Sequence, residues 1–222
     1  SVMLTFFEGL DKPSMENTAS YEFTPNLNIL TATQQDNFVQ VLLTLAEPME
    51  DGVVYAVTVK QTLTDCSGNS ADLTDTVQVG IPQKPEPQDI IINEVMFNPA
   101  SGDARYIEFY NRSEKVFDWR RFFIGNYQNV VGTSEIVQRR LSVPGHYQVF
   151  SSNAPNVRER FQNIYYRNVM ENNLPTLDDK EGRIRLYWAM NGDTVELDEL
   201  PYNDSWHNGL YSVGDRDGVA LE

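Results

Sequence analysis

Hydrophobic and polar residues alternate along two stretches near the start of the chain. In VVYAVTV, residues 53–59, Tyr55 and the valines on either side of it occupy every second position, and FVQVLLTL, residues 38–45, repeats the pattern. A period of two residues is that of a β-strand with one buried face. Asp51-Gly52 supplies a tight turn between the two runs, and DCSGN, residues 65–69, supplies another. Short strands at this spacing predict an antiparallel sandwich.

The second half of the chain carries the same signals. IIINEVMF and ARYIEFYN are rich in β-branched and aromatic residues, and the turn formers NPASGD separate them. We expect Ile107 and Phe109 to face the core, and Tyr106, Glu108 and Tyr110 to face the other side. A turn at Pro144-Gly145 precedes a strand in GHYQVFSS, and APNVRERFQN, residues 154–163, is the only stretch that suggests a short helix.

The clearest hairpin is GRIRLYWAMNGDTVEL, residues 182–197. Asn191-Gly192 is a two-residue turn of the kind that joins antiparallel strands. Alternation directs Ile184, Leu186 and Trp188 inward, with Val195 and Leu197 on the returning strand. The pair Arg183 and Arg185 then lies on the solvent face.

A domain boundary is predicted in IPQKPEPQ, residues 81–88. Three prolines in eight residues favour an extended, semi-rigid spacer that cannot join the interior of a sheet. Charge also changes here: residues 1–88 hold 3 basic and 12 acidic side chains, and residues 89–222 hold 14 and 20. We therefore expect two domains, residues 1–85 and 86–222.

Motifs in the second domain carry a family resemblance. INEVMFNP, YIEFYN and VFDW…FIGN follow one another between residues 92 and 126, LSVPGHYQV spans 141–149 and VELDELPY spans 195–202. Over about residues 89 to 202 the chain resembles the lamin tail domain in its bacterial form. That resemblance implies an immunoglobulin-like β-sandwich and no catalyst. Residues 203–222 form a C-terminal extension that packs back or leads into a further segment.

The first domain resembles another family. The motifs are F-x-E-x-L-D from Phe6, A-x-Y-x-F from Ala19, GVVYAVTV from Gly52 and LTDCSGN from Leu63. They are similar to bacterial immunoglobulin-like modules of surface-layer proteins and adhesins, and we expect an N-terminal edge strand to be missing. The predicted fold is all-β, with two tandem immunoglobulin-like antiparallel β-sandwiches joined by a short Pro-rich linker.

Composition narrows the functional classes. The net charge of -15 disfavours non-specific binding to DNA or anionic membranes, which needs a cationic face. Cys66 is the only cysteine, so no intrachain disulfide and no cysteine-based zinc site can form. No apolar stretch reaches the length of about 18 residues that a membrane span requires. The chain begins at Ser1 without a signal peptide, so we expect a fragment of a larger protein.

Residues suited to catalysis are few. A hydrolytic triad needs a nucleophile beside a base, but His146 and His207 both stand in loops, and no G-x-S-x-G or H-E-x-x-H motif occurs. Glu94 and Glu108 could form the carboxylate pair of a glycosidase, because both stand in the middle of strands. We favour surface carboxylates paired with Arg105, Arg112 or Arg121. No catalytic, cofactor-binding or metal-binding residue is therefore assigned.

Calcium, nucleic acid and glycosylation remain alternatives. Oxygen-rich loops at residues 65–69, 178–182 and 215–218 suit a hard cation, although plain turns explain them as well. Phosphates could contact the arginine pairs at residues 139–140, 158/160 and 183/185, with Tyr165-Tyr166 for stacking, but solvated strand faces explain these pairs better. The tripeptide D-T-V at residues 75–77 and 193–195 resembles an O-glycosylation site of exported Bacteroidetes proteins.

The sequence thus favours a non-catalytic structural, adhesive or partner-binding segment of a larger exported bacterial protein, located in the periplasm, on the outer membrane surface or outside the cell. We expect a protein or cell-surface glycan as partner, and no cofactor. One alternative is an accessory module of a multidomain hydrolase, either a nuclease or a phosphatase. The other is a carbohydrate-binding module that uses Tyr127, Tyr187 or Trp206 for stacking.

Overall fold

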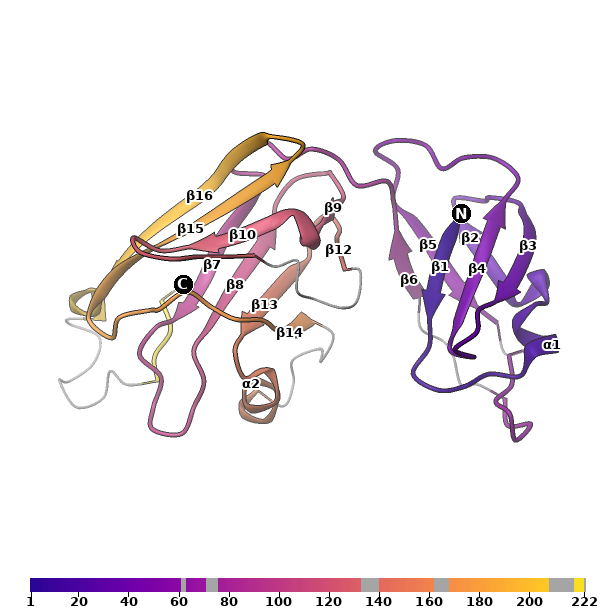
Figure 1. Cartoon of the computed structure of the whole chain (residues 1–222), viewed down its shortest axis with the longest axis horizontal. Coiled ribbons are helices and arrows are strands. Elements are labelled where there is room, and N and C mark those ends of the chain that lie inside the picture. The colour runs from indigo at the N-terminus through magenta and orange to yellow at the C-terminus, as the bar shows by residue number, and fades with distance from the viewer. Residues whose placement is uncertain (61–62, 71–75, 133–139, 162–167, 208–217, 222) are drawn as a thin grey trace. The chain divides into compact units, whose positions relative to one another are not determined.

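The computed structural model describes residues 1–60, 63–70, 76–132, 140–161, 168–207 and 218–221 of the chain. Contacts divide the chain into two compact units, Ser1–Ile81 and Pro82–Glu222, whose elements are labelled in Figure 1. The boundary expected from the sequence lay a few residues later, in the same proline-rich segment. Strands in antiparallel ladders dominate the described residues, so the all-β class predicted from the alternation is confirmed.

The first unit packs two three-stranded sheets on one core. Their orders are β1-β4-β3 (Val2–Thr5, Gln40–Leu45, Ile29–Gln34) and β2-β5-β6 (Tyr21–Thr24, Tyr55–Val59, Thr76–Val79). The alternation correctly predicted the inward side chains, since Val41, Leu43, Tyr55 and Val57 are at most 3% exposed.

Asp51-Gly52 is a turn, as predicted, but it does not form a hairpin. Gly52 has a positive φ of 78°. β4 pairs with β1 and β3, whereas β5 pairs with β2 and β6. The chain therefore crosses from one sheet to the other at this turn, because each strand has an apolar face that only a facing sheet can bury.

A short helix in the first unit was missed in the sequence. α1 (Lys12–Met15) begins after Asp11, whose carboxylate accepts a hydrogen bond from the Ser14 backbone N at 3.0 Å. Pro13 stands in its first turn, and Met15 is fully buried. An Asp followed closely by Pro is a helix-start signal, so the sequence did carry this information. The 3-10 helix η1 (Thr18–Ser20) follows.

The second unit packs two four-stranded sheets around a larger core. One has the order β14-β13-β8-β7 (Val169–Glu171, Tyr147–Ser151, Tyr106–Asn111, Ile90–Met96), and the other has the order β11-β10-β15-β16 (Val130–Gly132, Phe122–Gly125, Glu181–Met190, Asp193–Asn203). β9 (Phe117–Asp118) pairs with β12 (Leu141–Ser142), and the described part of the unit also contains the 3-10 helices η2 (Trp119–Arg121) and η5 (Asp204–His207). Of the ladders between described strands in this unit, only β13 with β14 is parallel.

Trp119 lies at the centre of the core of the second unit. Its ring centroid is 4.8 Å from that of Phe122, 5.1 Å from that of Phe150 and 5.8 Å from that of Phe109. All four rings are at most 1% exposed. Tilted and edge-on contacts of this kind add to the stability that burial of the rings provides.

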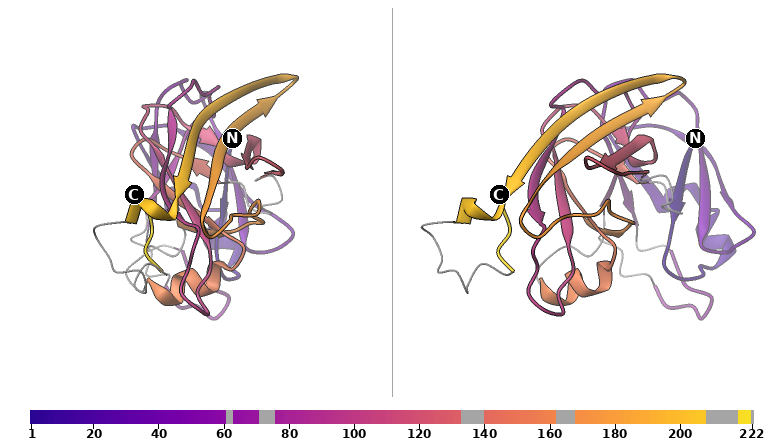
Figure 2. Two further views of the ribbon diagram at one scale, coloured as in Figure 1. Left: turned by 90° about the vertical axis from the view of Figure 1, so that its left-hand side faces the viewer. Right: turned by 60° about the vertical axis from the view of Figure 1, so that its left-hand side comes forward.

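The hairpin predicted at Asn191-Gly192 is confirmed. β15 and β16 flank these two residues and form the long curved hairpin in Figure 2. Both turn residues have positive φ, 53° for Asn191 and 89° for Gly192, as a two-residue turn between twisted strands requires. Ile184, Leu186 and Trp188 point into the core, as the alternation predicted.

The proline-rich segment is not a free spacer from Gln83 onward. The Gln83 backbone N donates to the Val116 carbonyl at 2.7 Å, and the Gln88 backbone N donates to the Leu197 carbonyl at 2.7 Å. Lys84 forms an ion pair with Asp193 at 2.8 Å. The backbone N–H groups of Gln83 and Gln88 thus hold this segment on the second unit, so the spacer interpretation is wrong for these residues.

The end of the chain packs back on the second unit. Val95 and Leu221 exchange two backbone hydrogen bonds, of 2.9 and 3.0 Å, so residues 218–221 run beside the β7 strand. Leu221 also packs against the main core. This outcome matches one of the two alternatives expected for the C-terminal extension.

The helix predicted at residues 154–163 forms as α2 (Ala154–Arg160). It covers part of the outer face of the β14-β13-β8-β7 sheet, where Ala154 and Val157 pack with Met96 and Tyr106. Tyr106 therefore faces away from the main core, as predicted, but it is only 6% exposed. The alternation correctly assigned the side of the sheet and could not show that a helix covers it.

Replacement of Gly182 by Ala is expected to destabilise the second unit. A Cβ there would collide with Tyr202 Oη and lie 2.6 Å from Tyr202 Cζ, so the ring would be pushed from its contact with Phe97, 4.5 Å away between centroids. Overpacking of this kind lowers the free energy of unfolding by about 1–3 kcal/mol, which denaturant titration would measure. Thr194→Ala, at an exposed site on the same hairpin, is the control, and equal stability of Gly182→Ala and wild type would contradict the packing argument.

The second unit is also expected to lose stability in alkali through Tyr202. Burial raises the pKa of this tyrosine to about 12, whereas the pKa of an exposed tyrosine is about 10. Between those values the unfolded chain loses the proton more readily than the fold, so the stabilising contribution disappears as the pH rises. Tyr202→Phe should lessen the fall of Tm between about pH 10 and pH 12, whereas the exposed Tyr127→Phe should leave it as in wild type. An unchanged alkaline profile for Tyr202→Phe would contradict this assignment.

Candidate functional site

The outer side of the β11-β10-β15-β16 sheet displays a cluster of charged and aromatic side chains. Alternation along β15 turns Arg183, Arg185 and Tyr187 outward, because the residues between them fill the core. Glu199 of β16 is the register partner of Arg185, and Tyr127 follows β10 in a loop at the same side. We call these five residues the Arg–Tyr face.

Glu199 holds both arginines of the Arg–Tyr face. Its Oε1 lies 2.7 Å from Arg183 Nη1, and its Oε2 accepts a hydrogen bond from Arg185 Nε at 2.5 Å. Arg185 Nη1 also donates to Tyr187 Oη at 3.2 Å. The hydrogen bonds that Arg185 donates, to Tyr187 first and then to Glu199, raise the pKa of its guanidinium further above the ordinary value. Two permanent cations joined by one carboxylate can hold a ligand, but they supply no group that takes up a proton.

The two tyrosines are held in place by the protein. The Arg183 guanidinium carbon lies 4.9 Å from the centroid of the Tyr127 ring, which is 67% exposed. A Cβ at Gly125 would lie 3.1 Å from Tyr187 Cε2, so the glycine allows that ring to rest on the strand. The Tyr127 loop is closed by Asn126, whose Oδ1 accepts backbone hydrogen bonds from Gln128 at 2.7 Å and from Asn129 at 2.5 Å. Each ring therefore has a contact with the protein that favours one position.

The sequence named Tyr127, Tyr187, Arg183 and Arg185 for separate reasons and missed Glu199. In the register that the Asn191-Gly192 turn sets, Arg185 would lie opposite Asp198. A β-bulge beside Leu186 shifts the ladder by one residue and brings Glu199 opposite Arg185 instead. The alternation of residues along β16 gives no sign of the extra residue that forms this bulge.

Glu94 and Glu108 lie directly opposite each other on β7 and β8. Strict alternation after the inward-facing Ile92 would turn Glu94 into the core, but a bulge between these residues, at Asn93, reverses its side. Both carboxylates therefore lie on the outer face, as predicted. They are half-buried rather than fully solvated.

The bonding of this glutamate pair differs from the expectation. Tyr106 Oη donates to Glu94, and Asn93 Nδ2 donates to Glu108 Oε1 at 2.8 Å. Arg105, one of the expected partners, forms its ion pair with Asp179 instead. A tyrosine hydroxyl and a side-chain amide thus bind these carboxylates on the outer face of the sheet.

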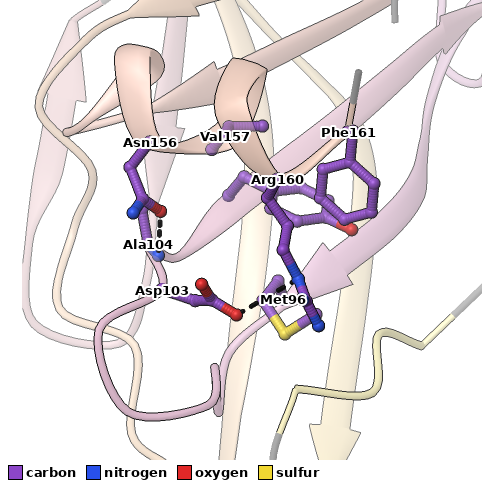
Figure 3. A pocket seen from close by; sticks show the side chains of 8 residues that line it. Met96, Asp103, Ala104, Asn156, Val157, Arg160 and Phe161 are labelled. Atoms are coloured by element: carbon purple, nitrogen blue, oxygen red, sulfur yellow. Dashed lines mark hydrogen bonds and ion pairs between the residues drawn. The ribbon is translucent and has the colours of Figure 1, made fainter. Parts of the chain in front are cut away.

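A shallow hollow lies beside α2 on this outer face (Figure 3). Met96 and Tyr106 from the sheet line it together with Phe161, and an ion pair of 3.3 Å between Arg160 and Asp103 crosses its rim. It encloses about 220 Å³, open solvent included. The enclosed part amounts to about 10 Å³, room for about one water molecule, so the hollow is too small for a drug-sized ligand.

The two histidines stand apart from these clusters. His146 follows the Pro144-Gly145 turn, and burial lowers the pKa of its imidazole. His207 is the last residue of η5, and its side chain lies outside the described residues. Trp206, the third tyrosine or tryptophan proposed for stacking, is 51% exposed in the same short helix.

The other two arginine pairs named in the sequence do not belong to the Arg–Tyr face. Arg158 and Arg160 both belong to α2, where Arg158 donates to the Val169 carbonyl at 2.5 Å. Arg139 and Tyr165-Tyr166 lie outside the described part of the chain. Of the two D-T-V tripeptides, the one at residues 193–195 has its Thr194 exposed on the β15–β16 hairpin. In the one at residues 75–77, Asp75 lies outside the described residues.

The oxygen-rich loops use their carboxylates internally. Asp65 accepts hydrogen bonds of 2.8 Å from the backbone N of Ser67 and of Asn69 and from the Asn69 side chain, and the last of these contributes most to the lowering of its pKa. Asp178 accepts from the Lys180 backbone N at 2.9 Å. Within the described residues no group of three His, Cys, Asp or Glu is placed to hold a metal ion, and residues 215–217 lie outside them.

Calcium is therefore expected to leave the stability of the chain unchanged. Asp65 already accepts three N–H donors, and a cation would have to compete with those bonds to bind. Thermal melts in the presence of calcium or of a chelator should give the same Tm. A calcium-dependent rise in Tm would contradict this, and its loss in Asp65→Asn but not in Asp215→Asn would place the ion at the first loop.

Comparison with known proteins adds little to this description. Among the described residues, no helix has the length and apolar character to cross a membrane. No protein-family model and no curated protein matches the chain. The chain is similar to a solved structure titled "Crystal structure of the S-layer protein rSbsC(31-844)", with 11% identity and a TM-score of 0.33 over 90% of this chain and 38% of that chain. It thus spans well under half of that protein, and a likeness at this level identifies neither a family nor a function.

Proposed function

We propose that the chain is a non-catalytic binding segment of a larger exported bacterial protein, and that its second unit binds a partner through the Arg–Tyr face. The observation that carries the proposal is the preformed arrangement on that face. Two exposed or half-buried tyrosines and two arginines are fixed by Glu199, Gly125 and the Asn126 turn. Groups that are ordered in advance lose little conformational entropy on binding.

We also propose the immunoglobulin-like fold of both units and a family for each. Each unit packs two mainly antiparallel sheets around one core, which supports two tandem immunoglobulin-like sandwiches. The motifs between about residues 89 and 202 support a lamin tail domain for the second, and those from Phe6 to Asn69 support a surface-layer or adhesin type for the first.

A non-catalytic role fits the chemistry of the described clusters. Arginine cannot take up or release a proton near neutral pH, and Glu199 is paired with Arg183 and Arg185, so the Arg–Tyr face offers no free acid or base. Glu94 and Glu108 are hydrogen-bonded within the sheet by Tyr106 and Asn93. Partner binding is the function that this arrangement supports best.

Binding is expected to be seen in co-sedimentation with the cell-envelope fraction of the organism that encodes the chain. Wild type should sediment with the envelope, and the double variant Tyr127→Ala/Arg185→Gln should lose about tenfold or more in apparent affinity. Tyr147→Ala is the matched control, because Tyr147 is 43% exposed on the other sheet of the same unit.

Two outcomes would overturn the proposed function. One is the absence of sedimentation for wild type. The other is turnover of a phosphodiester or p-nitrophenyl glycoside substrate that is abolished by Glu94→Gln or Glu108→Gln, since the glutamate pair would then be catalytic.

A further inference from the structure

The Arg–Tyr face presents hydrogen-bond donors that the fold does not use. Nη2 of Arg183 and Nη2 of Arg185 donate no hydrogen bond to any residue in the described part of the chain. Arg183 Nε is shielded from solvent and likewise has no partner among the described residues. Among the described residues, the two Nη2 groups thus keep their hydrogens for water or a ligand.

Further carboxylate acceptors lie beside the Arg–Tyr face. Alternation places Glu181 and Glu196 on the outward side of the hairpin, where both are exposed, and Glu196 is the register partner of Tyr187. Two arginines therefore face three glutamates, so the face as a whole does not favour an anionic ligand. A mixture of donors and acceptors suits hydroxyl groups, which both donate and accept.

The tyrosines contribute flat apolar surface between these polar groups. Each ring is supported by the protein, Tyr127 by the Arg183 guanidinium and Tyr187 by Gly125. Val130 beside them is 62% exposed and extends the apolar strip. Phenol rings with one polar tip suit a ligand that has apolar C–H faces and polar edges.

We propose that the Arg–Tyr face binds an uncharged polysaccharide, with sugar rings on Tyr127 and Tyr187 and hydroxyl groups on the arginines and on the glutamates at the ends of the face. The proposal rests on the proposed function and names the class of its partner. The face lies along two long strands instead of in a hollow, so it fits an internal stretch of a polymer chain. The negative charge of the whole chain works against a polyanion.

Affinity electrophoresis in native gels tests this directly. The chain is run through gels that contain hydroxyethylcellulose, galactomannan or arabinoxylan, with a gel that contains polygalacturonate as the charged comparison. We expect retardation by at least one of the three uncharged polymers, little dependence on salt, and none by polygalacturonate. Retardation by none of the three uncharged polymers, or by polygalacturonate alone, would overturn the proposal.

Variants locate the binding on the face. Tyr127→Ala and Tyr187→Ala are each expected to raise the Kd about tenfold, and Arg185→Gln several-fold, with the fold checked by circular dichroism. Tyr147→Ala and Arg160→Gln are matched controls outside the face and should bind as wild type. If Tyr187→Ala does not fold, Tyr127→Ala still decides, because this loop side chain is 67% exposed. Unchanged binding in Tyr127→Ala would refute the assignment.

The result separates the two proposals. Envelope binding that is retained without polysaccharide binding would leave the proposed function standing and refute the glycan, in favour of a protein partner. Loss of both would refute both.

Discussion

The register of the β15–β16 ladder is the constraint on which the second unit depends. Side chains alternate between the two faces of a strand, so a slip by one residue would turn the core residues to solvent and the arginines inward. The Asn191-Gly192 turn sets the register at one end, and the bulge beside Leu186 resets it further along. The buried row of Ile184, Leu186 and Trp188 and the Arg–Tyr face are therefore two consequences of the same pairing.

The β15–β16 ladder also covers the β7 edge of the β14-β13-β8-β7 sheet. Because of the bulge, Asp198 reaches β7, where its carboxylate accepts a hydrogen bond from the Ile92 backbone N at 2.8 Å. Farther along, Leu221 pairs with Val95 through backbone bonds. An unpaired edge is a site of aggregation, and here a side chain and the end of the chain both occupy it. The core and this edge are thus specified together.

Two bulges, and not the alternation, determine where the carboxylates lie. At Asn93 the bulge turns Glu94 outward and brings it opposite Glu108, where Tyr106 and Asn93 bind the pair. Beside Leu186 the bulge brings Glu199 to the two arginines. The first pair is hydrogen-bonded by Tyr106 and Asn93 within its own sheet, whereas Glu199 forms ion pairs with two arginines of its neighbouring strand.

Local pattern was enough to predict the strands, their inward residues and the hairpin at Asn191-Gly192, because period-two burial and positive φ at a turn are properties of a few neighbouring residues. It was also enough for α2, and the start signal at Asp11 could have revealed α1. The crossing at Asp51-Gly52, the helix that covers Tyr106 and the partner of Glu94 required the folded structure. Each depends on a residue distant in sequence, and a bulge that changes the register leaves no mark in the alternation of one strand.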